Sequence, residues 1–340
     1  MSDGRFRDEF GEVAALIERH GRFLILGHID PDGDCIGSML ALARFLRAKG
    51  KQAVCFAPGE ISRIYLDLPD AEMIVPESEI ERFEQEVVFT LDSPTPARTA
   101  DIIEPENGQL IVNIDHHPTN ERYGTINIVE EHTSAAAVLV YRLLSAIDPA
   151  GIDSVIADYL YLGIMMDTGG FRFQNTDAES LSCAASLVGL GARPHHLAHD
   201  FLFAKTYDSL KLLAGALQSL ELHCGGRLAV MEISGAMIAE SGGSMNDTEG
   251  FVDYPASVDT IELCALFREL GAQEIRVSLR SRSTRDVAKL AERFGGGGHR
   301  KAAGLTIRKS LEEAKSIIIA DLSELLEQGG DRDSGEGSGG

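Results

Sequence analysis

The chain contains no tryptophan, only five cysteines and no long uninterrupted apolar segment. Because a membrane-spanning helix needs roughly 18 or more consecutive apolar residues, the sequence predicts no such helix. The cysteines are odd in number and never spaced as Cys-x-x-Cys, which argues against a disulfide framework or a thiolate zinc site. The stretch MSDGRFRDEF is charged and lacks the apolar centre of a signal peptide, so we expect a cytoplasmic protein that does not bind membranes.

Positive charge is also scarce. The chain has 31 Lys and Arg against 53 Asp and Glu, which gives a formal net charge of −22. Such a surface repels long polyanions, so the composition argues against tight binding to duplex DNA. The acidic composition is still compatible with a small anionic ligand, provided that metal ions or a local basic patch make the electrostatic potential at the binding site positive.

Apolar runs alternate with helical patterns in the first half of the chain. Expected strands span residues 23–27, 52–58, 86–94 and 109–118, and expected helices span residues 35–49, 134–147 and 154–169. Continuous apolar strands separated by helices indicate an α/β fold with a mainly parallel sheet flanked by helices.

The second half predicts a smaller mixed α/β domain. Its expected strands span residues 228–234 and 274–282, and its expected helices lie near 257–270 and 284–294. A length of 340 residues favours two domains. We expect a first domain at 1–192, a connection at 193–208, a second domain at 209–326 and a disordered acidic, Gly/Ser-rich tail at 327–340.

Carboxylates and imidazoles follow the ends of these elements in four separate segments. They are His28, Asp32 and Asp34 after the first strand, Asp92 after the third, Asp115, His116 and His117 after the fourth, and Asp167 at the end of the long helix. Taken singly, several have a structural explanation as turn, loop or helix-end residues. Ligands of parallel sheets bind beyond the carboxyl ends of the strands, however, so together these residues predict a site for divalent metal ions.

The same segments resemble a known family. GHIDPDGDCIGS, LDSP, IDHHPTN and GIMMDTGGFRF are similar, in this order, to the four motifs of the DHH phosphoesterases. The resemblance implies two Mn²⁺ ions per chain, with Mg²⁺ or Co²⁺ as alternatives. The implied ligands are His28 and Asp32 for one ion, Asp34, His116 and Asp167 for the other, and Asp92 as the bridge.

Neighbouring residues receive other roles from this resemblance. Asp115 would orient an adjacent histidine, and His117 would face the substrate phosphate as a hydrogen-bond donor or acid. Asp30 departs from the family pattern and stays outside the expected ligand set. Cys35 could add a soft ligand, but we favour a small helix residue there.

A glycine run marks the second domain. In RFGGGGHRKAAG, residues 293–304, the glycines allow a close approach of backbone to an anion, and RKAAG is expected to begin a helix. With IRVSLRSRSTRDVAKLAERF before it, the segment resembles the DHH-associated domain, whose active site lies in the cleft between the two domains. Expected phosphate contacts are Arg280, Arg282, Gly297, Gly298 and His299, with Arg172 from the first domain.

A further group of histidines lies in RPHHLAHD, at positions 195, 196 and 199. A histidine pair at i and i+4 can bind zinc, but no third ligand is evident in the sequence. We therefore favour a helix at the connection between the domains over a metal site.

The expected reaction is hydrolysis of a phosphoester by water activated between two metal ions. Length and domain content resemble the NrnA-like nano-RNases, which degrade RNA of two to five nucleotides, including pApA, and dephosphorylate 3′-phosphoadenosine 5′-phosphate to AMP. Expected partners are therefore short RNA oligonucleotides or small phosphonucleotides, and a homodimer is common among such proteins. The alternatives are a cyclic di-AMP phosphodiesterase, a non-catalytic nucleotide-binding sensor and a scaffold with structural ions.

Overall fold

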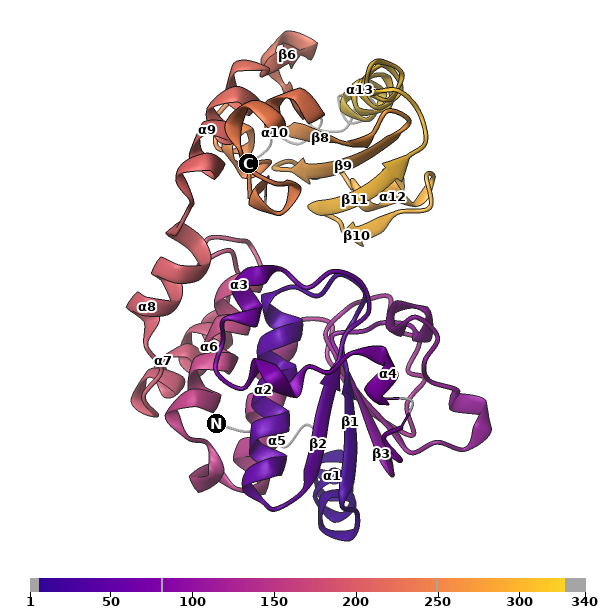
Figure 1. Cartoon of the computed structure of the whole chain (residues 1–340), viewed down its shortest axis with the longest axis vertical. Helices are drawn as coiled ribbons and strands as arrows, with labels where there is room; N and C mark the ends of the chain where they lie inside the picture. The colour runs from indigo at the N-terminus through magenta and orange to yellow at the C-terminus, as the bar shows by residue number, and fades with distance from the viewer. Residues whose placement is uncertain (1–5, 81, 249, 328–340) are drawn as a thin grey trace, which may run out of the picture. The chain divides into compact units, whose positions relative to one another are not determined.

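The computed structural model describes residues 6–80, 82–248 and 250–327 of the chain. They form two compact units, Met1–Ala204 and Lys205–Gly340, and Figure 1 shows their elements. The boundary falls inside the predicted connection at 193–208. The predicted tail lies, apart from Glu327, outside the described residues. No described helix has both the length and the apolar character that crossing a membrane requires.

The first unit contains a parallel sheet in the strand order β2-β1-β3-β4-β5, as the alternation of strands and helices predicts. Its strands are β1 (Arg22–Leu26), β2 (Gln52–Phe56), β3 (Val87–Leu91), β4 (Ile111–Asp115) and β5 (Ile126–Val129). Four of them match expected strands, and β5 was not anticipated. All five run in the same direction, so the residues after β1, β3 and β4 share one edge of the sheet.

Alternate side chains of β1 enter two separate cores. Phe23 and Ile25 pack in the larger core, while Leu24 and Leu26 pack in a smaller one on the opposite face. Figure 1 shows α2 and α5 beside the strands on the side of the larger core. Helices that contribute to this core are α1 (Arg7–Arg19), α2 (Gly33–Ala48), α5 (Ala136–Ile147), α6 (Ser154–Asp167) and α7 (Ala178–Gly189).

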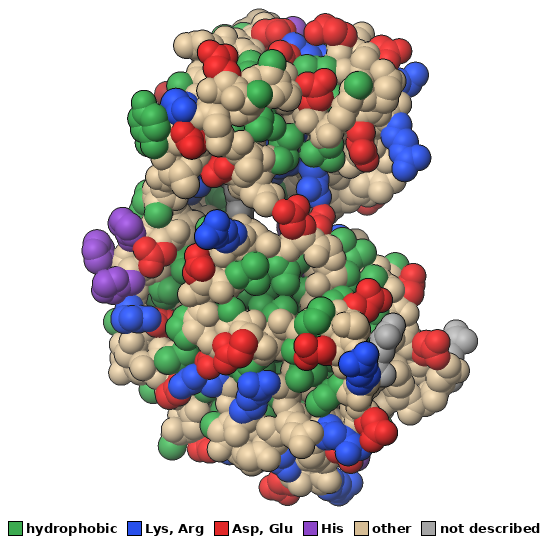
Figure 2. All heavy atoms as spheres, viewed as in Figure 1, with side chains coloured by type: hydrophobic (Ala, Val, Ile, Leu, Met, Phe, Trp, Pro, Cys, Tyr) green, Lys and Arg blue, Asp and Glu red, His purple; other side chains and the backbone are tan. Residues whose placement is uncertain are grey.

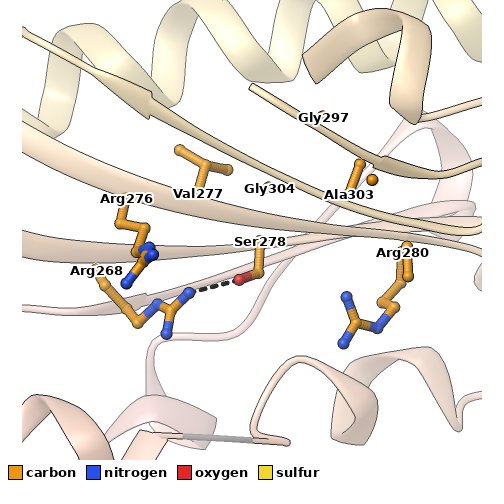
Figure 3. A pocket seen from close by; sticks show the side chains of 10 residues that line it. Arg268, Arg276, Val277, Ser278, Arg280, Gly297, Ala303 and Gly304 are labelled. Carbon is orange, nitrogen blue, oxygen red and sulfur yellow. Dashed lines mark hydrogen bonds between the residues drawn. The ribbon is translucent and has the colours of Figure 1, made fainter. Parts of the chain in front are cut away.

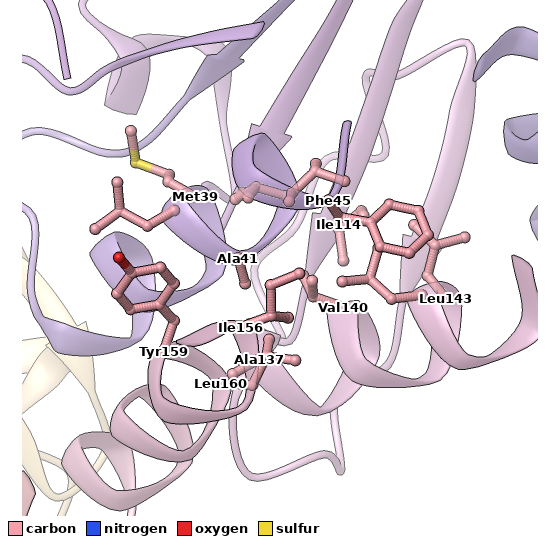
Figure 4. Close-up of a cluster of buried hydrophobic side chains, with 14 of the residues drawn as sticks. Met39, Ala41, Phe45, Ile114, Ala137, Val140, Leu143, Ile156, Tyr159 and Leu160 are labelled. Atoms are coloured by element: carbon pink, nitrogen blue, oxygen red, sulfur yellow. The ribbon is translucent and has the colours of Figure 1, made fainter. Parts of the chain in front are cut away.

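Close packing of α2 against α6 fixes the helices that carry the candidate ligands. A Cβ atom at Gly37 would lie 2.4 Å from the carbonyl oxygen of Tyr159, so only glycine lets the two backbones approach this closely. Figure 4 shows Met39 and Ala41 of α2 among Tyr159 and Leu160 of α6. Shorter helices complete the unit: α3 (Arg63–Leu66), α4 (Glu77–Ile80), α8 (Pro194–Ala198) and the π-helix His199–Phe203.

The second unit is a mixed sheet in the order β10-β11-β9-β8-β7-β6, in which only β7 and β8 run parallel. Its strands are β6 (Glu221–His223), β7 (Leu228–Ile233), β8 (Leu263–Gly271), β9 (Glu274–Ser281), β10 (Gly297–His299) and β11 (Ala302–Ile307). Its helices are α9 (Tyr207–Gln218), α10 (Gly235–Ser241), α11 (Asp253–Ala256), α12 (Ala288–Glu292) and α13 (Leu311–Glu327). The expected small mixed α/β domain is confirmed.

Two expectations for this unit are wrong. Residues 263–270 of the predicted 257–270 helix belong instead to β8, in the interior of the sheet. A short apolar run such as LCALF fits a buried strand and a buried helix equally well, so its hydrophobic periodicity does not distinguish the two structures. Residues 302–307 after the glycine run form β11 and not a helix, because they pair with β9 across residues 275–280. The predicted 284–294 helix is present but shorter, as α12.

Candidate metal centre

The turn after β1 places two candidate ligands at the start of α2. Asp32 is the N-cap of this helix, and its Oδ1 accepts hydrogen bonds from the backbone N–H groups of Asp34, at 3.0 Å, and Cys35, at 3.1 Å. The buried His28 directs Nε2 toward carboxylates, 3.9 Å from Oδ1 of Asp32 and 3.5 Å from Oδ2 of Asp92.

Asp92 lies at the centre of the site. It is buried, and its φ of 54° is a left-handed conformation that costs energy in a non-glycine residue. Its Oδ1 is 3.4 Å from Nε2 of His116 and 3.4 Å from Nδ1 of His117, yet it has no hydrogen-bond partner among the described residues. A buried carboxylate oxygen without a donor is costly in an apolar interior and fits a position beside a cation.

Asp34 and Asp167 come from two neighbouring helices. The carboxylate of Asp34 accepts hydrogen bonds from the N–H groups of Ala136, at 2.6 Å, and Ala137, at 2.9 Å, at the start of α5. Asp167 ends α6, and its Oδ2 is 3.7 Å from Nε2 of His116. The other ring nitrogen of His116 is 3.1 Å from the carbonyl oxygen of Thr133, which orients the ring.

These side chains form overlapping groups whose ligand atoms lie within 4.8 Å of one another. The groups are His28, Asp32 and Asp92; Asp34, Asp92 and His116; and Asp92, Asp115 and His117. The first two could each hold an ion, with Asp92 in common. The structure therefore brings together the residues that the sequence singled out, and Asp167 lies beside the second group through His116.

The electrostatics of the cluster favour a cation. Burial, together with Asp92 and Asp167, raises the pKa of Asp34 well above its ordinary value. Burial raises the pKa of Asp167 to about 7, against the opposing effect of His116. Burial opposes the charged form of His28, but Asp32 and Asp92 raise its pKa to about 10. Without a metal ion, Asp34 and Asp167 thus favour their protonated forms, and a divalent cation would displace these protons.

His117 differs from the other two histidines because Asp115 holds its Nδ1. Oδ1 of the fully buried Asp115 is 2.8 Å from Nδ1 of His117, and its Oδ2 accepts a 2.6 Å hydrogen bond from Asn120. Asn120 also donates to Oδ1 of Asn113 at 2.8 Å. Asn120 is not among the site residues expected from the sequence, although it belongs to the IDHHPTN segment that carries the resemblance.

Asp30 and Cys35 remain outside this cluster. Oδ1 of Asp30 accepts from the N–H of Glu60 at 3.3 Å. The thiol of Cys35 is fully buried, lies 3.7 Å from the sulfur of Met39, and has a pKa raised by burial. The donor set is therefore carboxylate oxygen and imidazole nitrogen, which suits Mn²⁺ or Mg²⁺ better than a thiophilic metal.

A pocket with a cavity volume of about 310 Å³ lies on the sheet of the second unit. It brings together Arg280, Gly297 and Gly298, as expected, and adds Arg268 and Arg276, which the sequence argument passed over. Figure 3 shows the three arginine side chains extending from β8 and β9 toward the same side of the sheet. The lining is as follows: Arg268, Arg276, Val277, Ser278, Arg280, Gly297, Gly298, Ala302, Ala303 and Gly304.

Other expected contact residues are exposed. Arg282 donates to the carbonyl oxygen of Val258 at 2.7 Å, and His299 lies on β10; neither belongs to the described lining of the pocket. In the first unit, Nε of the exposed Arg172 donates to the carbonyl oxygen of Gly169 at 2.6 Å.

The histidine group at 195, 196 and 199 lies on α8 and the π-helix, as expected for a helical segment. Figure 2 shows histidine side chains gathered on the surface where Figure 1 places α8. Nδ1 of His199 is 2.8 Å from Oδ1 of Asp200. Within the described part of the chain, these histidines belong to no group of three or more potential metal ligands.

Comparisons with known proteins agree with this architecture. Residues 22–164 match the DHH family, N-terminal domain, and residues 225–328 match the DHHA1 domain. The bifunctional oligoribonuclease and PAP phosphatase NrnA of Thermus thermophilus is 33% identical over 94% of this chain and 94% of its own length. An exopolyphosphatase-related protein of Bacteroides fragilis superposes with a TM-score of 0.87 at 25% identity, over 94% of this chain and 98% of its own.

A more distant structure shares the fold. RecJ of Thermus thermophilus in complex with Mn²⁺ superposes with a TM-score of 0.55 at 14% identity, over 94% of this chain and 55% of RecJ. Together, the fold and the matched domains define a phosphoesterase, a hydrolase of phosphoric esters. The chain belongs to the DHH family and carries its DHHA1 domain.

Proposed function

We propose that this protein hydrolyses short RNA oligonucleotides of two to five nucleotides, including pApA, to mononucleotides and also dephosphorylates 3′-phosphoadenosine 5′-phosphate to AMP. The observation that carries the proposal is Asp92, a buried carboxylate common to two groups of ligands, with one oxygen that no described donor satisfies. The similarity to an oligoribonuclease and PAP phosphatase along almost the whole chain supports the substrate class.

The donor set fits two Mn²⁺ ions. His28 and Asp32 would hold one, Asp34, His116 and Asp167 the other, and Asp92 both. When bound, such ions lower the pKa of water and neutralise charge on the reacting phosphate. Complexes of RecJ, a protein with the same fold, with Mn²⁺ and with Mg²⁺ support a divalent cation of this kind.

His117 is the proposed general acid. Its Nδ1–H donates to Oδ1 of Asp115, so Nε2 is the nitrogen that would face the substrate. In the protonated ring, Nε2 donates to the leaving oxygen and delivers a proton to it as the bond to phosphorus breaks. Asp115 stabilises this imidazolium, and Asn120 keeps the carboxylate in place.

The pocket of the second unit is the proposed binding site for the remaining phosphates of the substrate. Its arginines present several N–H donors, and the glycines of β10 and β11 leave the backbone accessible. Arg280 donates to Oδ1 of Asp253 at 3.0 Å, so its guanidinium is already oriented. The aromatic residues that stack on bases are absent from the described lining, which favours recognition of phosphate over recognition of base identity.

A turnover panel tests the proposal. The protein is incubated with Mn²⁺ and pApA, a five-nucleotide RNA, 3′-phosphoadenosine 5′-phosphate, cyclic di-AMP or pyrophosphate, and the products are separated by chromatography. We expect AMP from pApA and from 3′-phosphoadenosine 5′-phosphate. Hydrolysis of cyclic di-AMP alone would replace the proposal by the phosphodiesterase alternative, and tight nucleotide binding without turnover would favour the sensor.

A further inference from the structure

Arg98 occupies a position beside the candidate metal centre that neither the sequence motifs nor the proposed function uses. It lies in the short helix Pro96–Thr99, which follows Asp92 at the end of β3. Its carbonyl oxygen accepts a 2.8 Å hydrogen bond from the N–H of Ile29, and its Nη2 donates to the carbonyl oxygen of Ile29 at 3.3 Å. Both contacts hold the residue against the turn that presents His28.

The guanidinium of Arg98 has no carboxylate partner within the described part of the chain. Some arginines of this unit pair with carboxylates, as Arg44 does with Asp70 at 2.6 Å and Arg142 with Glu130 at 2.6 Å. Arg98 is exposed and forms no such pair with any described carboxylate, although its guanidinium reaches His28 at the edge of the acidic cluster. A guanidinium without a carboxylate partner is well suited to bind phosphate oxygens.

The ring of His28 defines where the guanidinium of Arg98 lies relative to the candidate metal ligands. Nδ1 of His28 lies 2.9 Å from the carbonyl oxygen of Ile29 and 3.0 Å from Nη2 of Arg98. Nε2 faces Asp32 and Asp92, so it is the nitrogen available to a metal ion. These contacts place the guanidinium of Arg98 beside the ligand group of His28, Asp32 and Asp92.

We propose that Arg98 binds a phosphate oxygen of the substrate next to the ion held by His28 and Asp32. The inference rests on the proposed function, because it assigns a contact to the same substrate. Arg98 thereby adds a positively charged donor in the first unit, where the other side chains near the ions are mainly acidic.

The test compares Arg98→Ala and Arg98→Lys with Arg19→Ala. Arg19 is a matched control, because it is exposed and precedes the opposite end of β1. Steady-state rates are measured with Mn²⁺ and pApA. We expect KM to rise roughly tenfold to hundredfold in Arg98→Ala, with a smaller effect on kcat, because one charge-assisted hydrogen bond is lost. Arg98→Lys recovers part of the loss, and Arg19→Ala behaves as the wild type.

Two measurements without turnover separate substrate binding from a structural role. Calorimetry with pApA carrying a phosphorothioate linkage gives the affinity of each Mn²⁺-loaded variant, which we expect to fall in parallel with the rise in KM. Titration with Mn²⁺ alone and thermal unfolding give metal affinity and stability, which we expect to match those of the wild type. If Arg98→Ala loses metal affinity or stability in proportion to activity, the residue only ties two segments together and the inference is overturned.

The inference and the proposed function fail in different ways. An active wild type whose KM and analogue affinity are the same in Arg98→Ala, within about twofold, overturns the role of Arg98 and leaves the proposed function intact. A wild type that turns over none of the panel overturns the proposed function. In that case the calorimetric comparison still tests the role of Arg98. Equal affinities of the wild type and Arg98→Ala for the phosphorothioate analogue overturn the phosphate contact, and a loss of affinity confined to Arg98→Ala supports it.

Discussion

Asp92 combines features that rarely occur in a residue with a purely structural role. It is a carboxylate that is buried, adopts a left-handed backbone conformation and lies close to three histidines. Strained backbone conformations of this kind persist where the surrounding structure enforces them, and they concentrate at functional sites. The side chain is thus held among candidate ligands that follow β1 and β4 or lie in α2.

Asp92→Asn tests this position with little change to the backbone, because asparagine tolerates positive φ far better than alanine does. We expect turnover to fall by roughly a thousandfold, the range that follows loss of a major electrostatic group. Mn²⁺ content per chain should fall below that of the wild type, with the circular dichroism spectrum unchanged. Wild-type turnover at wild-type metal content would contradict a bridging carboxylate.

Asn120 is a positioning residue in this structure. Its amide donates to Asp115 and Asn113, and its Oδ1 accepts from the N–H of Arg122 at 2.7 Å, so its orientation is fully defined. Asn120→Ala frees the Asp115 carboxylate that holds His117. We expect kcat to fall by roughly tenfold to hundredfold, the usual effect of losing such a partner, with KM and Mn²⁺ affinity nearly unchanged.

Asn127→Ala serves as the control for Asn120→Ala. The side chain of Asn127 bonds only to the backbone of Gly124 among the described contacts, in the turn before β5. We expect this variant to lose some thermal stability while its kcat stays at the wild-type value. An equal drop of kcat in both variants would mean that the effect comes from the loop and not from His117.

At the scale of elements, three packed helices set the position of Asp34. Asp34 lies in the first turn of α2, accepts hydrogen bonds from the start of α5 and faces Gly163 of α6. A Cβ atom at Gly163 would be 2.6 Å from Oδ1 of Asp34 and 2.7 Å from Cβ of Ala137. Glycine at this position therefore leaves the space that the carboxylate occupies.

Gly163→Ala should displace Asp34 and overpack the junction of the three helices. We expect a loss of about 1–3 kcal/mol in the free energy of unfolding and a clear loss of Mn²⁺ affinity. Gly215→Ala in α9 is the control, because its nearest contact would be Met237 at 4.0 Å, and it should be neutral or slightly stabilising. Chemical denaturation and Mn²⁺ titration measure both effects, and unchanged metal affinity in Gly163→Ala would contradict this account.

The sequence predicts the first unit better than the second for a physical reason. The strands and helices of the first unit end in charged or proline-containing segments, so β1, β3, β4 and α6 are recognisable from local patterns. In the second unit, β8 and β11 are defined by their pairing with β9, and β11 is distant from β9 in the sequence. The apolar runs of β8 and β11 show no periodicity that would distinguish a strand from a helix. Secondary structure that depends on pairing cannot be read from such a run alone.

At the scale of the whole molecule, a similar distinction separates the parts of the site. Candidate ligands such as Asp92 and His116 stand at element ends that the pattern marks, and the fold brings them together. Arg98, Arg268 and Asn120 make contacts that form only in the folded chain, to His28, Ser278 and Asp115 respectively. The local sequence of Arg98 and Arg268 does not distinguish these contacts from those of a solvated side chain, and Asn120 is marked only by its place in the IDHHPTN segment.

The acidic cluster also makes the stability of the whole protein depend on pH and metal together. Asp34 and Asp167 have pKa values raised by burial, that of Asp167 to about 7, and His28 has a pKa raised to about 10. The folded, metal-free protein therefore binds more protons than the unfolded chain between roughly pH 4 and 9. A group with a raised pKa stabilises the fold below its unfolded pKa, and this contribution is lost as the pH rises through the folded pKa.

Thermal unfolding between pH 5.5 and 8.5, with EDTA or with saturating Mn²⁺, checks this linkage. We expect the Tm of the metal-free protein to fall as the pH rises, and Mn²⁺ to raise the Tm by a margin that grows with pH to roughly 5 °C or more, because the ion replaces protons on the same groups. Asp167→Asn should flatten the metal-free profile near pH 7, where this carboxyl group titrates. A stabilisation by Mn²⁺ that is the same at pH 5.5 and 8.5 would mean that the ion binds away from these carboxylates, since only ligands that release protons make the affinity depend on pH.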